Sequence, residues 1–318
     1  MSQSQAQGPS RRRILSAMAA GAAAVGAGAF FPLRRGWASA PIYKHADLEA
    51  IVVSDGHFFL PTGLLVAPDA PVGERQAALK AAAQTGDQFQ LVNNVVLIRR
   101  QSDLILVDAG TGPRHQPTAG KLAENLKAAG IQPADVTTVV LTHGHPDHLW
   151  GVLDAGGNPT YPRASYVVSA RELDLWADPE VLQRLPAVLP RERIVSGAQN
   201  HFARIRDKMR MVRGGDEIVS GIRVLETRGH TQGHISLEVA GGDGLVIGGD
   251  ALINAIVSFQ YPSWRVPVDQ DADLAISTRL RLLDQLATDK RRLFGAHLPS
   301  PGIGFVERKD QAYRFVPV

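Results

Sequence analysis

The most constraining feature of this chain is a histidine-rich segment, Thr142 to His148, that directly follows an apolar run from Val136 to Leu141. The run is rich in β-branched residues, the composition expected of a buried strand. The segment after it holds three histidines and one aspartate within six residues. Side chains on irregular backbone at the end of a strand are where catalytic residues concentrate. The chain must therefore fold so that a strand delivers these groups together, and we predict a metal-dependent hydrolase.

The spacing of these four residues favours two metal ions. His143 and His145 are two positions apart, so they can face the same side of an extended segment and share one ion. Asp147 and His148 are adjacent and cannot repeat that direction, so they could serve a second ion nearby. Two cations held this close repel each other unless a carboxylate lies between them, and Asp250 is the candidate bridge. The chain has no cysteine, and imidazole with carboxylate suits Zn²⁺, with manganese, cobalt and iron as alternatives.

Two further histidines, His230 and His297, also follow short apolar runs and glycines, and we predict that they complete the ligand set. Taken alone, each is equally well explained as an ordinary turn or loop residue. His234 and Asp108 are predicted to support the ligands rather than bind metal, although Asp108 could instead cap a turn. The other histidines, among them His115, are interpreted as surface or hydrogen-bonded residues.

The first 40 residues have the layout of an export signal. Arg11 to Arg13 precede an apolar run to about Leu33, and Ala38 to Ala40 form a small-residue cleavage site. The paired arginines indicate the twin-arginine route and a periplasmic location. A retained membrane anchor is the alternative, but the run is only weakly hydrophobic. We therefore expect a cleaved signal over residues 1–40, no stable membrane anchoring afterwards, and one hydrolase domain over residues 41–318.

Removing the signal changes the charge balance. The whole chain has 34 basic and 31 acidic residues, and residues 1–40 contain five arginines and no acid. The mature chain therefore has 29 basic and 31 acidic residues. A near-neutral protein without a basic excess does not favour a nucleic acid partner. We expect a small-molecule ester substrate instead.

The pattern of apolar runs and glycine-rich turns predicts an α/β fold. Asp55 and Gly56 form a dipeptide favoured in tight hairpins, so a hairpin turn is expected there. No internal repeat or low-complexity linker interrupts residues 40–318, which favours a single domain. Strands are predicted over residues 51–54, 57–60, 89–100, 104–107, 136–141, 165–168, 222–226, 235–239 and 245–247, and helices over residues 73–83, 118–130 and 272–287.

As a set, these motifs resemble the metallo-β-lactamase superfamily over residues 50–300. The resemblance implies a four-layer αβ/βα sandwich: two mixed β-sheets face to face, helices outside, and an active site along one edge. It also implies how the ligands are shared, with Asp250 bridging the two metals. One metal would be bound by His143, His145 and His230, and the other by Asp147, His148 and His297.

Within that superfamily, the C-terminal segments 249–252, 259–264, 297–304 and 313–317 look like those of methyl parathion hydrolase and its relatives. Those proteins hydrolyse organophosphate triesters, lactones or aryl esters. The resemblance also suggests a homodimer. The lack of cysteine excludes members with a thiolate ligand. The oxygen-reducing branch usually has an acid where this chain has His145, so redox chemistry is disfavoured.

We therefore predict a hydrolase in which a metal-bridging hydroxide attacks a small ester, with Asp147 accepting its proton. One alternative is a lactonase acting on acyl-homoserine or other lactones. Another, from a different class, is a metal-binding protein without catalytic activity. Trp176, Ile253 and Phe259 are candidates for the substrate pocket, although each could equally belong to the core.

Overall fold

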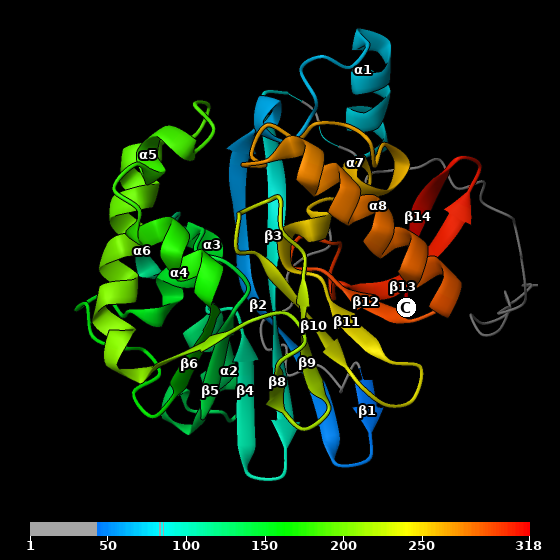
Figure 1. The fold of residues 1–318 in the computed structure, drawn as a ribbon. Helices are drawn as coiled ribbons and strands as arrows, with labels where there is room; N and C mark the ends of the chain where they lie inside the picture. Colours follow the sequence, from blue (N-terminus) through cyan, green and yellow to red (C-terminus); the bar gives the residue numbers. More distant parts are fainter. Residues whose placement is uncertain (1–42, 83, 85) are drawn as a thin grey trace, which may run out of the picture. The chain divides into compact units, whose positions relative to one another are not determined.

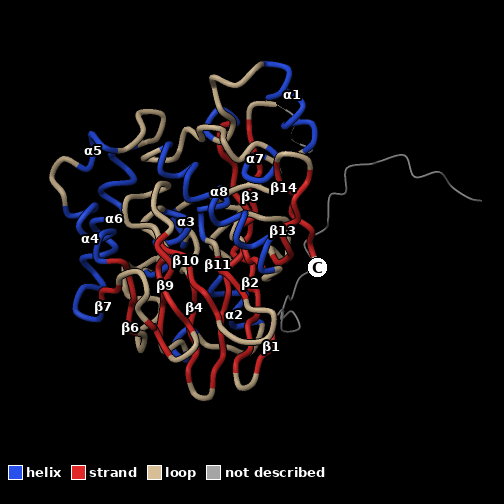
Figure 2. Tube along the Cα trace, turned by 45° about the vertical axis from the view of Figure 1, so that its right-hand side comes forward, coloured by secondary structure: helices blue, strands red, loops and turns tan. Residues whose placement is uncertain are grey.

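The computed structural model describes residues 43–82, 84 and 86–318, which form one compact unit. The export signal predicted for residues 1–40 lies outside these residues. Two seven-stranded sheets make up the centre of the unit (Figures 1 and 2). Each sheet contains both parallel and antiparallel pairs, so both are mixed.

The first sheet has its strands in chain order, β1 to β7. It is antiparallel from β1 to β4 and parallel from β4 to β7. Its strands are β1 (Tyr43–His45), β2 (Leu48–Pro61), β3 (Gln88–Arg100), β4 (Asp103–Val107), β5 (Thr138–Leu141), β6 (Ser165–Ser169) and β7 (Met209–Val212).

The second sheet runs from β8 to β14, again in chain order. All of its neighbouring strands are antiparallel except β11 and β12. Its strands are β8 (Glu217–Val219), β9 (Ile222–Glu226), β10 (Ile235–Val239), β11 (Leu245–Ile247), β12 (Arg292–Phe294), β13 (Ile303–Lys309) and β14 (Ala312–Pro317).

Helices cover the outer faces of both sheets. In Figure 1, α3 to α6 gather beside the first sheet in green, and α8 crosses the second sheet in orange. Within the part of the chain that the structure describes, every helix is too short or too polar to span a lipid bilayer. The α-helices are α1 (Val72–Ala81), α2 (Leu122–Ala128), α3 (Pro146–Leu149), α4 (Ala170–Ala177), α5 (Val181–Arg184), α6 (Arg191–Ile205), α7 (Val257–Gln260) and α8 (Ala272–Asp289).

Alternate residues of the central strands enter different cores, which explains why these strands are apolar throughout. On β5, Val140 packs in the core between the two sheets, and Val139 packs in the core beneath the outer helices. Leu126 of α2 belongs to that same outer core. On the far side, Leu293 of β12 packs in a third core with Leu283 of α8. Three apolar interfaces separate four layers, so the predicted αβ/βα sandwich is confirmed.

Most predicted elements lie within a few residues of the observed ones. The helix predicted over residues 272–287 extends to Asp289, and the strand expected from Val136 begins at Thr138. Val136 is nevertheless fully buried in the core beneath the helices. The apolar pattern therefore predicted the burial of Val136 correctly, although the hydrogen-bonded strand is shorter than the predicted one.

The hairpin predicted at Asp55 and Gly56 is wrong. Strand β2 is continuous through both residues and only shifts register between Ser54 and Gly56, as a β-bulge does. The Asp55 side chain is fully buried and accepts hydrogen bonds from Thr111 and from the backbone N–H of Leu122. Asp55 and Gly56, a dipeptide common in hairpin turns, therefore form a bulge that buries the Asp55 carboxylate while the strand continues.

Replacing Gly56 with alanine tests this bulge. Gly56 has φ +102°, and a Cβ there would lie 2.3 Å from the Thr118 carbonyl oxygen. Gly130 is a matched control, because it has φ +79° but a Cβ there would have nothing within 4 Å. We expect Gly130→Ala to lower the free energy of unfolding by about 1 kcal/mol, and Gly56→Ala by about 3 kcal/mol or more. Urea unfolding measures both, and equal losses would contradict the steric argument.

Candidate metal centre

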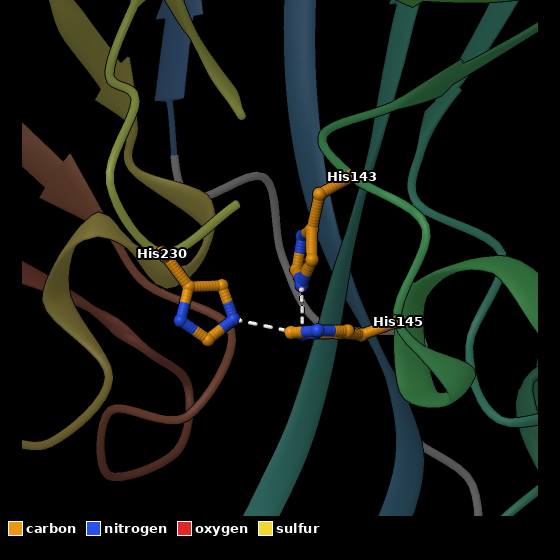
Figure 3. A group of neighbouring side chains, drawn as sticks. All are labelled: His143, His145 and His230. Atoms are coloured by element: carbon orange, nitrogen blue, oxygen red, sulfur yellow. Dashed lines mark hydrogen bonds between the residues drawn. The ribbon is translucent and has the colours of Figure 1, made fainter. Parts of the chain in front are cut away.

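The first group of candidate ligands is a triad of buried histidines. His143 and His145 lie in the loop that follows β5, and His230 lies in the loop that follows β9. Nδ1 of His145 is 3.0 Å from Nε2 of His143 and 2.9 Å from Nε2 of His230 (Figure 3). Two loops from different sheets thus bring three ring nitrogens to one point.

The second group combines two carboxylates and two histidines. Asp147 and His148 lie on α3, directly after the first triad's loop, and His297 follows β12. Oδ2 of Asp147 is 3.2 Å from Nε2 of His148 and 3.1 Å from Nε2 of His297. Each group is compact enough for its members to share one ion.

Asp250 faces both groups with different oxygens. It lies on the short 3-10 helix η6 (Gly249–Leu252) that follows β11. Its Oδ2 is 3.4 Å from Nε2 of His230, on the first group. Its Oδ1 is 3.2 Å from Nε2 of His148 and 3.3 Å from Nε2 of His297, on the second. One carboxylate therefore lies between the groups, where the sequence predicted a bridge.

Hydrogen bonds behind the ligands orient their lone pairs. Nδ1 of His297 is 2.8 Å from the Val92 carbonyl oxygen, which can only accept, so this nitrogen carries the proton. Nδ1 of His230 is similarly 3.0 Å from Asp269 Oδ1. In the neutral form of each ring, Nε2 then presents a lone pair to the centre. This is the arrangement that a metal-binding imidazole requires.

The two residues predicted to support the ligands lie behind them. Oδ2 of Asp108 is 2.8 Å from Nδ1 of His148, and its Oδ1 accepts the backbone N–H of Thr142. Nε2 of His234 accepts the backbone N–H of Asp250 at 2.9 Å. The lone pair that accepts this bond is not available to a metal, so His234 holds the backbone of Asp250 in place.

The charges of the two groups differ. Burial, with the neighbouring imidazole of His230, lowers the pKa of His145 to about 3, and burial also lowers the pKa of His143 well below its ordinary value. These two rings are therefore neutral near pH 7. Burial also acts to lower the pKa of His297, but the carboxylates of Asp250 and Asp147 outweigh it and raise that pKa to about 10. Ring nitrogens converge in the first group, and the two carboxylates of the second favour positive charge beside them, so both groups suit a cation.

An orphaned contact shows how that charge fits. Oδ1 of Asp250 and Nε2 of His148 lie 3.2 Å apart in the interior, yet neither has a hydrogen-bond partner among the residues that the structure describes. Buried polar atoms without a partner are rare in folded proteins. A divalent cation between imidazole and carboxylate would satisfy both atoms. The donor set therefore fits a dinuclear metal site.

A residue that the sequence analysis missed, Glu172 on α4, joins the two ligand loops. Its fully buried carboxylate accepts the backbone N–H of Gly144, between the first two histidines, at 2.7 Å. It also accepts the Thr231 hydroxyl at 2.6 Å and the Gly233 N–H at 3.1 Å, beside His230. A Cβ at Gly233 would lie 2.1 Å from the Glu172 backbone nitrogen, which explains the glycine in that loop.

Asn93 on β3 links the bulge on β2 to the metal centre. Nδ2 of Asn93 donates to Asp55 Oδ2 at 3.2 Å and to the backbone oxygen of Asp147 at 2.9 Å.

Asp269, behind His230, is another residue that the sequence did not predict. Its Oδ2 accepts a hydrogen bond from Nη2 of the buried Arg279 at 2.9 Å. None of these residues belongs to a motif, because each acts through partners distant in the sequence.

A cavity opens over the metal centre, and its walls are mainly apolar. Five predicted ligands face it, so a molecule in the cavity meets both groups. Those ligands are His145, Asp147, His230, Asp250 and His297. The apolar wall consists of Phe58, Leu60, Leu64, Leu65, Leu91, Leu189, Ile194, Ile253 and Val268, with Trp150, Pro146 and Pro190.

Of the three residues predicted for the substrate pocket, only Ile253 lines this cavity. The structure corrects the prediction for the other two. Trp176 is buried beneath the histidine loop, where its Nε1 donates to Glu172 at 2.7 Å. Phe259 is fully buried in the core under α8 and contacts Phe315 at a ring separation of 5.7 Å. Both side chains contribute packing, which an apolar residue's identity does not distinguish from substrate contact.

Residues 89–297 match the family model described as the metallo-β-lactamase superfamily. The chain belongs to the metallo-β-lactamase superfamily. AidC, described as a dizinc quorum-quenching lactonase in complex with a product, has a TM-score of 0.81 and 29% identity to this superfamily member. The hydrolase AbOPH has a TM-score of 0.77 and 31% identity. Each match covers 87% of this chain and 96% of the other.

Sequence relatives of this metallo-β-lactamase superfamily member cover less of it. Metallo-beta-lactamase domain-containing protein 1 of Xenopus laevis is 30% identical over 205 residues, which is 62% of this chain and 69% of that protein. An N-acyl homoserine lactonase of a Bacillus species is 24% identical over 180 residues, 56% of this chain and 62% of that protein. The structural matches thus extend further along the chain than these sequence matches.

Changing Glu172 to glutamine tests the link between the ligand loops. All the partners of this carboxylate are donors, on both oxygens, so an amide NH₂ in either orientation would face a donor. We expect zinc to bind about 10- to 100-fold more weakly, as for other groups that orient ligands. Competition with a chromophoric chelator measures this. Glu192→Gln, the same change on the exposed side of α6, is the control; equal affinities for the two variants would contradict the role.

Metal content tests the bridge. We expect about two metal ions per wild-type chain and a marked loss of occupancy in Asp250→Asn, because the amide cannot neutralise two cations. Elemental analysis after gel filtration gives the stoichiometry. Asp243→Asn, at an exposed turn, is the control. A single tightly held metal that is indifferent to Asp250→Asn would exclude a bridged pair.

Proposed function

We propose that this chain is a dinuclear zinc hydrolase that cleaves neutral ester bonds of small molecules, with lactones as its preferred substrates. The observation that carries the proposal is the apolar cavity that opens directly over the two ligand groups. Apolar walls with a few convergent polar groups are typical of a small-molecule site. Nitrogen and oxygen donors without sulfur are compatible with zinc, and the structural neighbour AidC is described as dizinc.

When bound, two divalent cations would lower the pKa of a shared water and polarise the substrate's carbonyl oxygen. The residues of the chain supply the rest. Burial acts against ionisation of Asp147, but His148 and His297 hold its pKa well below the usual range. Asp147 is therefore an ionised acceptor that faces the cavity, positioned to take a proton during attack.

The cavity favours an uncharged substrate with an apolar group. Among the described residues that line it, the only lysine or arginine is Arg193, which is exposed. Away from the metals, a negatively charged group would therefore find little compensation, whereas an alkyl or acyl chain would bury apolar surface against the leucine-rich wall. The description of AidC as a lactonase supports a lactone within this class. Organophosphate triesters and aryl esters stay predictions based on the C-terminal segments.

A substrate panel on zinc-loaded protein tests the function. We expect kcat/KM for N-hexanoyl homoserine lactone to exceed that for phenyl acetate and diethyl p-nitrophenyl phosphate by about tenfold or more, because only the lactone combines a cyclic ester with an alkyl chain. Asp147→Asn should lower kcat by about 100-fold or more. Asp154→Asn, a change at an exposed aspartate, is the control.

The same panel separates the alternatives. Faster turnover of the phosphate triester would replace the lactonase proposal with a phosphotriesterase. No turnover of any substrate by protein with full metal content would support a metal-binding protein without catalytic activity.

A further inference from the structure

His115 is a cavity residue that belongs to neither ligand group. It directly follows the 3-10 helix η2 (Gly112–Arg114) and lines the same cavity as Asp147 and His297. Both of its ring nitrogens are shielded from solvent, and neither has a hydrogen-bond partner in the described part of the chain. Buried polar atoms normally have partners, so two orphans in a cavity indicate a ligand that completes them.

Neighbouring rings hold the imidazole of His115 in place. Phe58 packs edge-on against it at 5.3 Å between centroids, and Trp150 does so at 6.0 Å. Phe58 also packs edge-on against the predicted ligand His297, at 5.7 Å. Phenylalanine would satisfy these aromatic contacts without burying unpaired nitrogens, so packing alone does not explain a histidine here.

Most other polar groups that line the cavity have other partners or belong to the metal centre. The remaining histidines and carboxylates in its lining belong to the metal centre. The exposed Arg193 donates from Nη2 to the Arg114 backbone oxygen at 3.1 Å, and its guanidinium lies 5.1 Å from the Trp150 ring centroid. Nε1 of Trp150 is a second buried nitrogen without a partner among the described residues, but an indole N–H can only donate, whereas the ring of His115 can both donate and accept. His115 is therefore suited to a part of the substrate that does not touch the metals and that needs both a donor and an acceptor.

The charge state of His115 defines which partner it suits. Burial lowers the pKa of His115 below its ordinary value, and the opposing effect of Asp147 does not restore it. The ring is therefore mainly neutral near pH 7, with one N–H donor and one acceptor nitrogen. A neutral imidazole is a poor proton donor to a leaving group but a good partner for an amide, which also offers both a donor and an acceptor.

We propose that His115 is a positioning residue that hydrogen-bonds an amide on the substrate outside the scissile ester, and so selects N-acyl lactones over plain alkyl lactones. The choice of lactone rests on the proposed function. Because a site built to hydrogen-bond a substrate discriminates against an analogue that lacks the group, the contact gives specificity that the apolar wall alone does not.

Binding of two ring-opened products tests the proposal without turnover. N-hexanoyl homoserine carries the amide, and 4-hydroxydecanoate has a similar carboxylate, hydroxyl and alkyl chain without it. By calorimetry on zinc-loaded protein, we expect the wild type to favour N-hexanoyl homoserine by tenfold or more. His115→Phe, which keeps the aromatic packing, should reduce that preference to less than threefold and leave 4-hydroxydecanoate binding unchanged. His57→Phe, outside the cavity lining, is the control.

No preference in the wild type, or an equal loss of both ligands in His115→Phe, would overturn the role of His115. His115→Gln keeps a donor and an acceptor, so it should retain part of the preference, and it replaces the phenylalanine variant if that one does not fold. If His115→Gln loses the preference for N-hexanoyl homoserine as completely as His115→Phe, the result contradicts the proposed hydrogen bond.

Kinetics separate this proposal from the proposed function. With N-hexanoyl homoserine lactone, His115→Phe should raise KM tenfold and change kcat less than twofold, whereas γ-decalactone should show neither effect. If the wild type turns over no lactone, the proposed function fails, but the product-binding preference still decides whether His115 recognises an amide.

Discussion

The metal centre depends on one buried carboxylate that holds together loops from opposite sheets. Gly144 lies in the loop after β5 of the first sheet, and Thr231 lies in the loop after β9 of the second. Glu172 accepts hydrogen bonds from both. Burial raises the pKa of Glu172 above its ordinary value, and these hydrogen bonds oppose that rise. Hydrogen bonds to a charged acceptor are stronger than neutral ones. The separation of His143 and His145 from His230 is therefore set by Glu172, which binds no metal itself.

Acidic residues behind the ligands extend this arrangement outward. Asp108 and Asp269 each face the outer nitrogen of one ligand histidine, and Asp269 is neutralised in turn by the buried Arg279. Such partners fix ring orientation and make the inner nitrogen a better ligand. Each of these buried acidic groups has a partner of opposite or potential positive charge. An unpaired buried charge would be strongly destabilising.

Substrate recognition and chemistry use different parts of the same cavity. The metal centre forms one region, and apolar side chains from β2, β3 and η1 (Thr62–Leu64) form much of the wall. Phe58 of the wall packs edge-on against both His115 and the predicted ligand His297. Changes in the wall can therefore alter which ester is accepted without disturbing the ligands.

The sequence alone determined the fold class and predicted the ligand set. Short-range patterns located the strands and the candidate ligands, and their resemblance to a known family implied the sandwich. Apolar and β-branched runs such as residues 136–141 are typical of buried strands, and the spacing from His143 to His148 places four predicted ligands on one loop and the helix α3 that follows it. Asp55 and Gly56 show the limit of local patterns. The same dipeptide suits a hairpin or a bulge, and contacts with Thr111 and Thr118 decided for the bulge.

Only the tertiary structure decided the roles of Glu172 and His115, and of Trp176 and Phe259. Glu172 acts on Thr231, which lies 59 positions away. His115 is distinguished from an ordinary histidine only by the partners that it lacks. Trp176 and Phe259 are apolar, and an apolar side chain gains from burial in a core as much as in a pocket wall. The spacing of a motif shows which side chains lie close together along one segment of the chain. Contacts between different loops form only when the two sheets pack together, so the sequence does not show them.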